Sequence, residues 1–143
     1  HNIWGKHTNF ELGTRVPLII HAAGQRDGVV SDSLVESLDI YPTVARLAGL
    51  PPPPDLDGLD LTPLWAAPHT ALKSAAFSEY PRCAPPDAAW TPEPGASAPQ
   101  SCIHTHRANF TIMGCSVRTD AWRATFWMWW DGSRLAGDFA RPP

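Results

Sequence analysis

The sequence has 143 residues, and its 11 Lys and Arg against 14 Asp and Glu give a formal net charge of -3. This balance excludes the concentrated basic face that nucleic-acid-binding and anionic-membrane-binding proteins need. Charged residues make up 17% and hydrophobic residues 43%, which excludes a charge-rich disordered chain, and 16 prolines exclude long uninterrupted helices.

The chain begins at His1 without a methionine or a signal sequence and ends at Arg141-Pro142-Pro143. No apolar run approaches the roughly 20 residues that cross a bilayer. We therefore expect a piece of a longer protein.

The first half predicts one strand and one short helix. Val16–Ala22 is a short apolar run rich in β-branched residues, typical of a buried strand. Apolar residues then recur at helical spacing, and Pro42 is tolerated only in a first turn, which predicts a helix over Ile40–Ala48. Asp39 is the expected N-cap, and Gly49 is the left-handed residue that ends the helix.

The middle of the chain is dominated by proline. Residues 51–54 predict an extended polyproline connector, followed by a short helical turn at Thr62–Trp65. Phe77–Tyr80 alternates apolar and polar residues, as a short strand does. Residues 81–101 are low in aliphatic residues and contain six prolines, which predicts a long surface loop.

The last third predicts an antiparallel hairpin. Its strands are Phe110–Val117 and Trp122–Trp130, joined by a turn at Arg118–Ala121. The tryptophans of the second strand alternate between both faces of the sheet, so we expect other protein to cover at least one face. A second turn is expected at Asp131-Gly132.

The three cysteines lack the spacing of a metal site. Cys83 and Cys102 bracket the Pro-rich loop and would form a disulfide in an oxidising compartment; the alternative is three unpaired thiols. Cys115 lies in an apolar run and is expected to be a small buried hydrophobe. Asn109-Phe110-Thr111 is a candidate glycosylation sequence.

Few residues have the spacing of a self-contained active site. No phosphate-binding glycine loop, nucleophile motif or set of metal ligands is present in the sequence. Convergent polar groups gather only before the predicted strand, where Lys6 is a point charge suited to a sulfate or phosphate oxygen. The alternative is a solvated surface lysine.

Five ordered blocks of sequence resemble the type I sulfatase family of the alkaline-phosphatase-like superfamily. The first comprises Lys6, a spacer with Asn9-Phe10-Glu11, and Arg15-Val16-Pro17-Leu18-Ile19. The others are Ser37–Leu50, Asp55–Leu64, Phe77–Arg82 and a last block of Ile112–Asp120 with Trp122–Trp127. The fourth and fifth blocks are most similar to the iduronate-2-sulfatase branch. Together the five blocks cover most of the chain, apart from the Pro- and Ala-rich insertion at 83–101.

The resemblance implies an α/β fold, with this chain as the C-terminal part of an alkaline-phosphatase-like sulfatase. Residues 1–66 would end the catalytic α/β domain, and residues 67–143 would form an antiparallel β subdomain. Within the family a hydrated formylglycine attacks sulfur and a calcium ion polarises the sulfate. Both the nucleophile and the calcium ligands would precede His1, so this chain supplies no metal ligand. Lys6 alone corresponds to a family site residue, as the lysine that contacts the sulfate.

The resulting hypothesis is a fragment of an enzyme that hydrolyses sulfate esters, with a sulfated small molecule or glycan as substrate. Alone it would be inactive, because it needs the N-terminal part of its own chain. The resemblance implies a lysosomal or secreted protein, without a nucleic-acid or membrane partner. The alternatives are a phosphodiesterase or phosphonate hydrolase of the same superfamily, or a non-catalytic module that binds glycans through its tryptophans.

Overall fold

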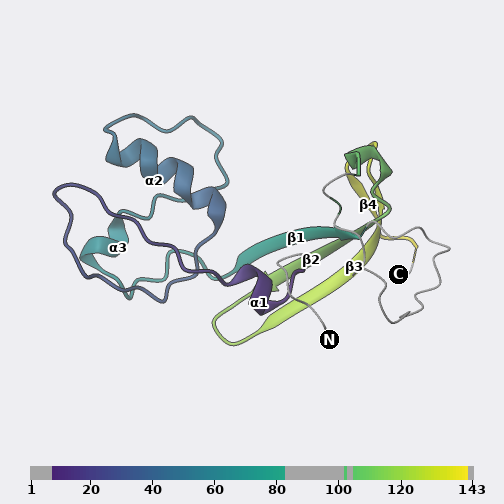
Figure 1. Ribbon diagram of the computed structural model, residues 1–143, viewed down its shortest axis with the longest axis horizontal. Helices are drawn as coiled ribbons and strands as arrows, with labels where there is room; N and C mark the ends of the chain where they lie inside the picture. The colour runs from purple at the N-terminus through teal and green to yellow at the C-terminus, as the bar shows by residue number, and fades with distance from the viewer. Residues whose placement is uncertain (1–7, 83–101, 103–104, 142–143) are drawn as a thin grey trace, which may run out of the picture. The chain divides into compact units, whose positions relative to one another are not determined.

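The computed structural model describes residues 8–82, 102 and 105–141 (Figure 1). These residues form two compact units. One contains the described residues of 17–77 and 118–122, and the other contains those of 1–16, 78–117 and 123–143. The predicted domain boundary after residue 66 stays a prediction.

The first unit is organised around helix α2, Ile40–Leu47, which follows a 3₁₀ turn at Ser37–Asp39. The predicted helix is therefore confirmed to within one residue. Gly49 has a φ of 70°. The N–H of Leu50 donates to the carbonyl of Ala45 at 2.9 Å, and that of Gly49 donates to Arg46 at 3.0 Å. This pair of hydrogen bonds ends a helix when the residue after the last turn, here Gly49, has a left-handed backbone conformation.

A small core joins α2 to the loop that follows the polyproline connector. Thr43 is fully buried, and its hydroxyl donates to the Asp39 carbonyl at 2.6 Å while it accepts the N–H of Leu61 at 2.9 Å. Leu61 and Leu64, which follow the polyproline connector, are also buried. Leu64 belongs to α3, Pro63–Ala66, which confirms the predicted helical turn.

The predicted buried strand at Val16–Ala22 is wrong. This segment is extended but belongs to no sheet, and Val16 and Ile19 are 57% and 90% exposed. A strand needs a neighbour that accepts and donates its backbone hydrogen bonds. No described segment donates to or accepts from the backbone of residues 16–21 in this way. The apolar composition correctly indicated an extended segment, but composition does not identify the strand with which such a segment would pair.

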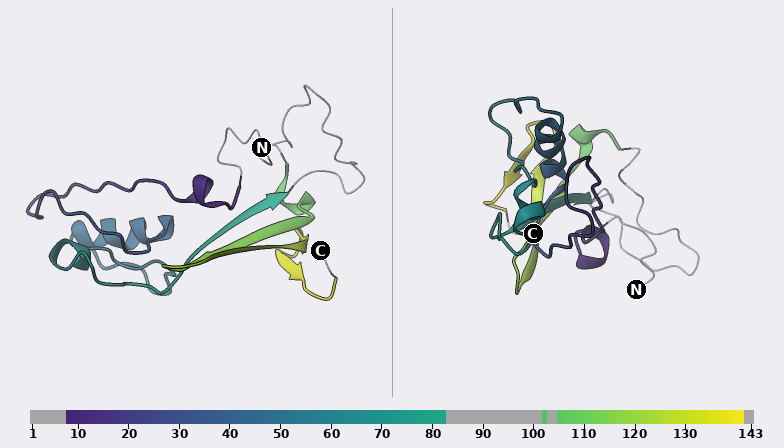
Figure 2. Two further views of the ribbon diagram at one scale, coloured as in Figure 1. Left: turned by 90° about the horizontal axis from the view of Figure 1, so that it is seen from below. Right: turned by 90° about the vertical axis from the view of Figure 1, so that its left-hand side faces the viewer.

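The second half of the chain forms one four-stranded antiparallel sheet in the order β1-β2-β3-β4. The strands are β1 Ala76–Arg82, β2 Ile112–Arg118, β3 Arg123–Asp131 and β4 Ala136–Asp138, and Figures 1 and 2 show the three long ones side by side. The predicted hairpin and the strand at 77–80 are confirmed, but β1 continues through Pro81 and Arg82, where a loop was predicted. The hairpin turn lies one residue later than predicted, closed by the Thr119 N–H on the Trp122 carbonyl at 2.8 Å.

The short β4 is an element that the sequence did not predict. It pairs antiparallel with the end of β3, with Trp129 opposite Asp138 and Trp130 opposite Gly137. Its three residues are too few to show an alternating pattern. The turn expected at Asp131-Gly132 is confirmed, and it leads directly into this strand.

The tryptophans of β3 are half-buried, and two of them pack beneath arginines. The guanidinium of Arg82 lies 4.5 Å from the Trp127 ring centre, and that of Arg141 lies 3.7 Å from the Trp129 ring centre. Gly114 of β2 lies so close to Trp127 that a Cβ there would be 2.7 Å from the ring atom Cε3. Part of the expected cover of the aromatic strand therefore comes from this chain itself.

Replacing Gly58 with Ala is expected to lower the free energy of unfolding by about 1–3 kcal/mol. The added Cβ would collide with the carbonyl oxygen of Leu38 and lie 3.1 Å from the Asp39 nitrogen. Both obstacles are backbone atoms, which cannot rotate away. Urea unfolding measures the effect, with the exposed neighbour Asp57→Ala as control. Equal midpoints for the two variants would contradict this close approach.

Candidate functional site

The structure describes some of the candidate site residues that the sequence predicted, but not all of them. Lys6 and Cys83 lie outside the described residues. Cys102 is disulfide-bonded, and its pairing with Cys83 stays a prediction. Asn109 is exposed at the end of a 3₁₀ turn.

Cys115 is a free thiol that is half-buried rather than buried as predicted. Burial, and secondly the negative charge of Glu79, raise the pKa of its thiol. The thiolate, which is the reactive form of cysteine, is therefore disfavoured at neutral pH.

The segment that follows Lys6 in sequence is held firmly against the sheet. Asn9 is 1% exposed, and its side-chain amide donates to the carbonyl of Gly114 on β2 at 2.7 Å. The chain then turns into α1, Glu11–Thr14, a single turn without a side-chain cap. The beginning of the described chain is thus fixed by a buried contact between Asn9 and a residue 105 positions away.

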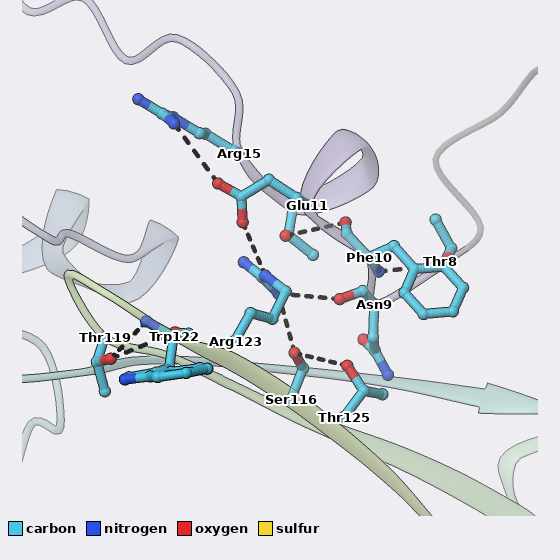
Figure 3. A network of polar contacts seen from close by, with 11 residues as sticks. Thr8, Asn9, Phe10, Glu11, Arg15, Ser116, Thr119, Trp122, Arg123 and Thr125 are labelled. Carbon is cyan, nitrogen blue, oxygen red and sulfur yellow. Dashed lines mark hydrogen bonds and ion pairs between the residues drawn. The ribbon is translucent and has the colours of Figure 1, made fainter.

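Arg123, at the start of β3, organises this region (Figure 3). Its Nε donates to Glu11 Oε2 at 2.7 Å, and its Nη1 donates to the Asn9 carbonyl and to Ser116 Oγ, both at 2.9 Å. Ser116 also accepts from Thr125 Oγ1 at 3.0 Å. We call Asn9, Glu11, Ser116, Arg123 and Thr125 the Arg123 cluster.

The Arg123 cluster is a positioning device rather than a reactive site. The Arg123 side chain is only 18% exposed. Its planar guanidinium donates to Glu11, Asn9 and Ser116 within the cluster. Charge-assisted hydrogen bonds of this length are among the stronger polar contacts in proteins. The cluster therefore fixes residues 9–11, which follow Lys6 in the sequence, on the β2–β3 hairpin.

Sequence reasoning missed the Arg123 cluster, although a signal was present. Asn9 and Glu11 lie in the first of the sulfatase-like blocks, and Arg123 and Thr125 lie in the last. The blocks are about 110 residues apart, so their pairing was not evident from spacing. Two distant blocks that both match one family are candidates for a shared contact.

A second buried cluster holds the first unit together. Lys73 Nζ lies 2.5 Å from Glu36 Oε2 and 2.9 Å from the Asp39 carboxylate. Asp39 was predicted to cap α2, but its side chain makes no cap bond. It accepts instead the N–H groups of Glu36 at 2.7 Å and Leu59 at 2.8 Å. Asp39 therefore stands at the predicted N-cap position, but its carboxylate is bound by a buried lysine and by two backbone N–H groups outside α2 in place of a cap bond.

Alkaline pH is expected to weaken the Lys73 cluster. Burial lowers the pKa of Lys73, but hydrogen bonds to and charges of Glu36 and Asp39 outweigh it and raise that pKa above the ordinary 10.5. Since the folded pKa exceeds the unfolded one, the stabilisation is fully present below pH 10.5 and is lost as the pH rises through the folded value. The unfolding free energies of the wild type and Lys73→Met should therefore converge at high pH. A constant difference across that range would contradict the assignment.

The described residues do not make a metal site. Residues 8–82, 102 and 105–141 contain no group of three or more His, Cys, Asp and Glu side chains placed to hold an ion. The carboxylates of Glu36 and Asp39 both pair with Lys73. No metal chemistry is therefore assigned to these residues.

Comparison with known proteins gives one consistent class, although no family model matches the chain. The chain is 29% identical to iduronate 2-sulfatase of Mus musculus, over 98% of this chain and 32% of that protein. It is 32% identical to N-acetylgalactosamine-6-sulfatase of Sus scrofa, over 94% of this chain and 21% of that protein. Arylsulfatase A of Homo sapiens is 46% identical over 42% of this chain. The chain thus spans about one third or less of the length of these proteins.

Proposed function

This chain belongs to the sulfatase family, and we propose that the protein containing it hydrolyses sulfate esters. The observation that carries the proposal is the match to sulfatases over 94–98% of this chain. We further propose that its two units are part of an alkaline-phosphatase-like α/β fold. The mixture of short helices and an antiparallel sheet is consistent with that fold.

The finer proposal is a sulfated glycan as substrate, in the manner of iduronate 2-sulfatase. Two relatives named for sulfated sugars align with nearly the whole chain, whereas the arylsulfatase A match covers less than half of it. The substrate would meet Lys6, whose ammonium group is a compact charge with three donors for sulfate oxygens. The Arg123 cluster would hold the segment that carries Lys6.

We propose a nucleophile and a metal ion for the whole protein only because they are general features of the sulfatase family. Sulfatases in general use a formylglycine and a metal ion, here expected to be calcium. None of the described residues forms a site for that ion, so we derive no step through it and expect this chain alone to be inactive. The part this chain contributes is the binding and orientation of the sulfate.

We also propose a lysosomal or secreted location, which rests on the family resemblance. No helix within the described residues has both the length and the apolar character needed to span a bilayer. The partners would be the sulfated substrate and the N-terminal part of the same protein, without nucleic acid or membrane.

A paired assay of the full-length protein tests the proposal. We expect turnover of a chromogenic aryl sulfate that exceeds turnover of the matched aryl phosphate, and release of sulfate from sulfated oligosaccharides. Preference for the phosphate ester would support the phosphoesterase alternative. Oligosaccharide binding without any turnover would support a glycan-binding module. Turnover of aryl sulfate by residues 1–143 alone would contradict the proposed inactivity of the isolated chain.

A further inference from the structure

The sequence Asn109-Phe110-Thr111 is the single Asn-x-Ser/Thr sequence of the chain, and no step of the proposed sulfate chemistry uses it. We propose that Asn109 carries an N-linked glycan. The proposal rests on the proposed lysosomal or secreted location and is independent of the sulfatase activity.

Asn109 lies on a turn that presents its side chain to solvent. It is the last residue of the 3₁₀ helix η3, Arg107–Asn109, and it is exposed. Its amide side chain makes no hydrogen bond with any other residue in the described part of the chain. The next residue, Phe110, is extended, with φ -72° and ψ 125°. The acceptor amide therefore stands at the entry to β2 without a competing partner.

The backbone of this turn is fixed by hydrogen bonds and by a close approach of Gly132. The Asn109 N–H donates to the His106 carbonyl at 2.8 Å, and the His106 ring accepts the Ala108 N–H at 3.3 Å. Gly132 packs so closely under the turn that a Cβ there would collide with the Arg107 carbonyl oxygen and lie 2.9 Å from the Ala108 carbonyl carbon. Since Asn109 itself is exposed on this fixed turn, a large group on its side chain extends into solvent.

Asn9 provides a contrast within the same chain. It is also followed by phenylalanine, but Glu11 stands two residues later where an acceptor sequence needs Ser or Thr. Its amide is buried and bound to Gly114. Asn109 differs from it in both respects, in sequence and in exposure.

The modification is a glycosyl transfer with a defined balance of bonds. The side-chain nitrogen of Asn109 attacks the anomeric carbon of an oligosaccharide linked to a lipid diphosphate. A C–N bond forms, the bond from that carbon to the diphosphate oxygen breaks, and the amide loses one proton as the lipid diphosphate leaves. A bulky, solvating glycan suits an exposed surface position of a secreted protein.

The test is to express the full-length protein in cultured animal cells and to map its glycans. Trypsin releases Ala108–Arg118, a peptide in which Asn109 is the single asparagine. Deglycosylation by an amidase in heavy-oxygen water converts a glycosylated asparagine to labelled aspartate. We expect labelled peptide in the protein recovered from medium or lysosomes, and a gel shift on deglycosylation that the Asn109→Gln variant reduces by one glycan.

Substitutions at Thr111 separate the acceptor sequence from the acceptor residue. Thr111→Ala should abolish the label although Asn109 remains, and Thr111→Ser should keep it. Unlabelled peptide in protein recovered from medium or lysosomes would overturn the proposal, whatever its sulfatase activity. Recovery of the protein from the cytosol alone, with sulfatase activity intact, would contradict the proposed location and with it the glycosylation of Asn109. The proposed sulfatase function would not be affected by that result.

Discussion

Replacement of Lys73 with Met is expected to lower the free energy of unfolding by about 3–5 kcal/mol. Lys73, Glu36 and Asp39 are 12%, 13% and 0% exposed, so the two carboxylates have little access to water. Met has a similar length but no charge. Without the ammonium group, two like charges remain buried beside each other with no cation to neutralise them.

The effect should extend beyond the three side chains. Glu36 Oε1 also accepts the N–H of Phe77 at 2.7 Å, and Asp39 accepts that of Leu59. Loss of the ammonium group therefore loosens the contact of the turn before α2 with two other segments. Urea unfolding measures the change in midpoint.

Arg46→Met is the matched control for Lys73→Met. Arg46 lies in the same unit, and its Nε is 3.8 Å from Asp60 Oδ2, but its side chain is 71% exposed. Loss of an exposed ion pair costs at most about 1 kcal/mol. Similar midpoints for the Lys73 and Arg46 variants would contradict the buried cluster.

The double variant Lys73→Met, Glu36→Gln identifies the cause of the loss. Gln at 36 retains an oxygen that can accept the Phe77 N–H, and one of the two buried negative charges is gone. We expect the double variant to be more stable than Lys73→Met alone. A simple sum of the two single effects would indicate lost packing instead of repulsion between charges.

Local signals in the sequence predicted the elements whose causes are local. Pro42 in a first turn and Gly49 after the last turn bracket α2, and the structure places both as expected. The hairpin of β2 and β3 follows from alternating apolar residues on either side of a short polar turn. Neighbours in sequence are sufficient to specify such elements.

The contacts that organise the candidate site depend instead on distant partners. Arg123 meets Asn9 and Glu11 across 114 and 112 residues, and Lys73 meets Glu36 across 37. Nothing in the spacing of these residues states that they meet. The same limitation explains the error at Val16–Ala22, where composition indicated an extended apolar segment but not its neighbours.

Replacement of Arg123 with Met is expected to lower the free energy of unfolding by about 2–3 kcal/mol and kcat/KM for a sulfate ester by about tenfold to a hundredfold. The substitution leaves the Asn9 carbonyl, Ser116 Oγ and Glu11 without their common donor. The segment that follows Lys6 then loses its attachment to β3. Small displacements of a positioning segment are sufficient to reduce catalysis strongly.

Two further variants separate charge from geometry in the Arg123 cluster. Arg15 pairs with the other oxygen of Glu11 at 3.6 Å but is 73% exposed, so Arg15→Met should leave stability within about 0.5–1 kcal/mol of the wild type. Arg123→Lys keeps the positive charge but loses the planar fork, and should recover part of the activity. Equal losses from Arg123→Lys and Arg15→Met would contradict a geometric role.

A double-mutant cycle with Lys6 decides whether Arg123 acts through the lysine. If Arg123 supports catalysis by fixing the segment that carries Lys6, its replacement has little further effect on kcat/KM once Lys6→Ala has removed the ammonium group. The loss of stability, in contrast, should be the same in both backgrounds, since it arises from the contacts of Arg123 with Asn9, Glu11 and Ser116. Additive losses of activity would show that Arg123 contributes by a route independent of Lys6. Non-additive losses of kcat/KM together with additive losses of stability would show that the cluster positions Lys6. A general effect of Arg123 on folding would instead leave both losses additive with those of Lys6→Ala.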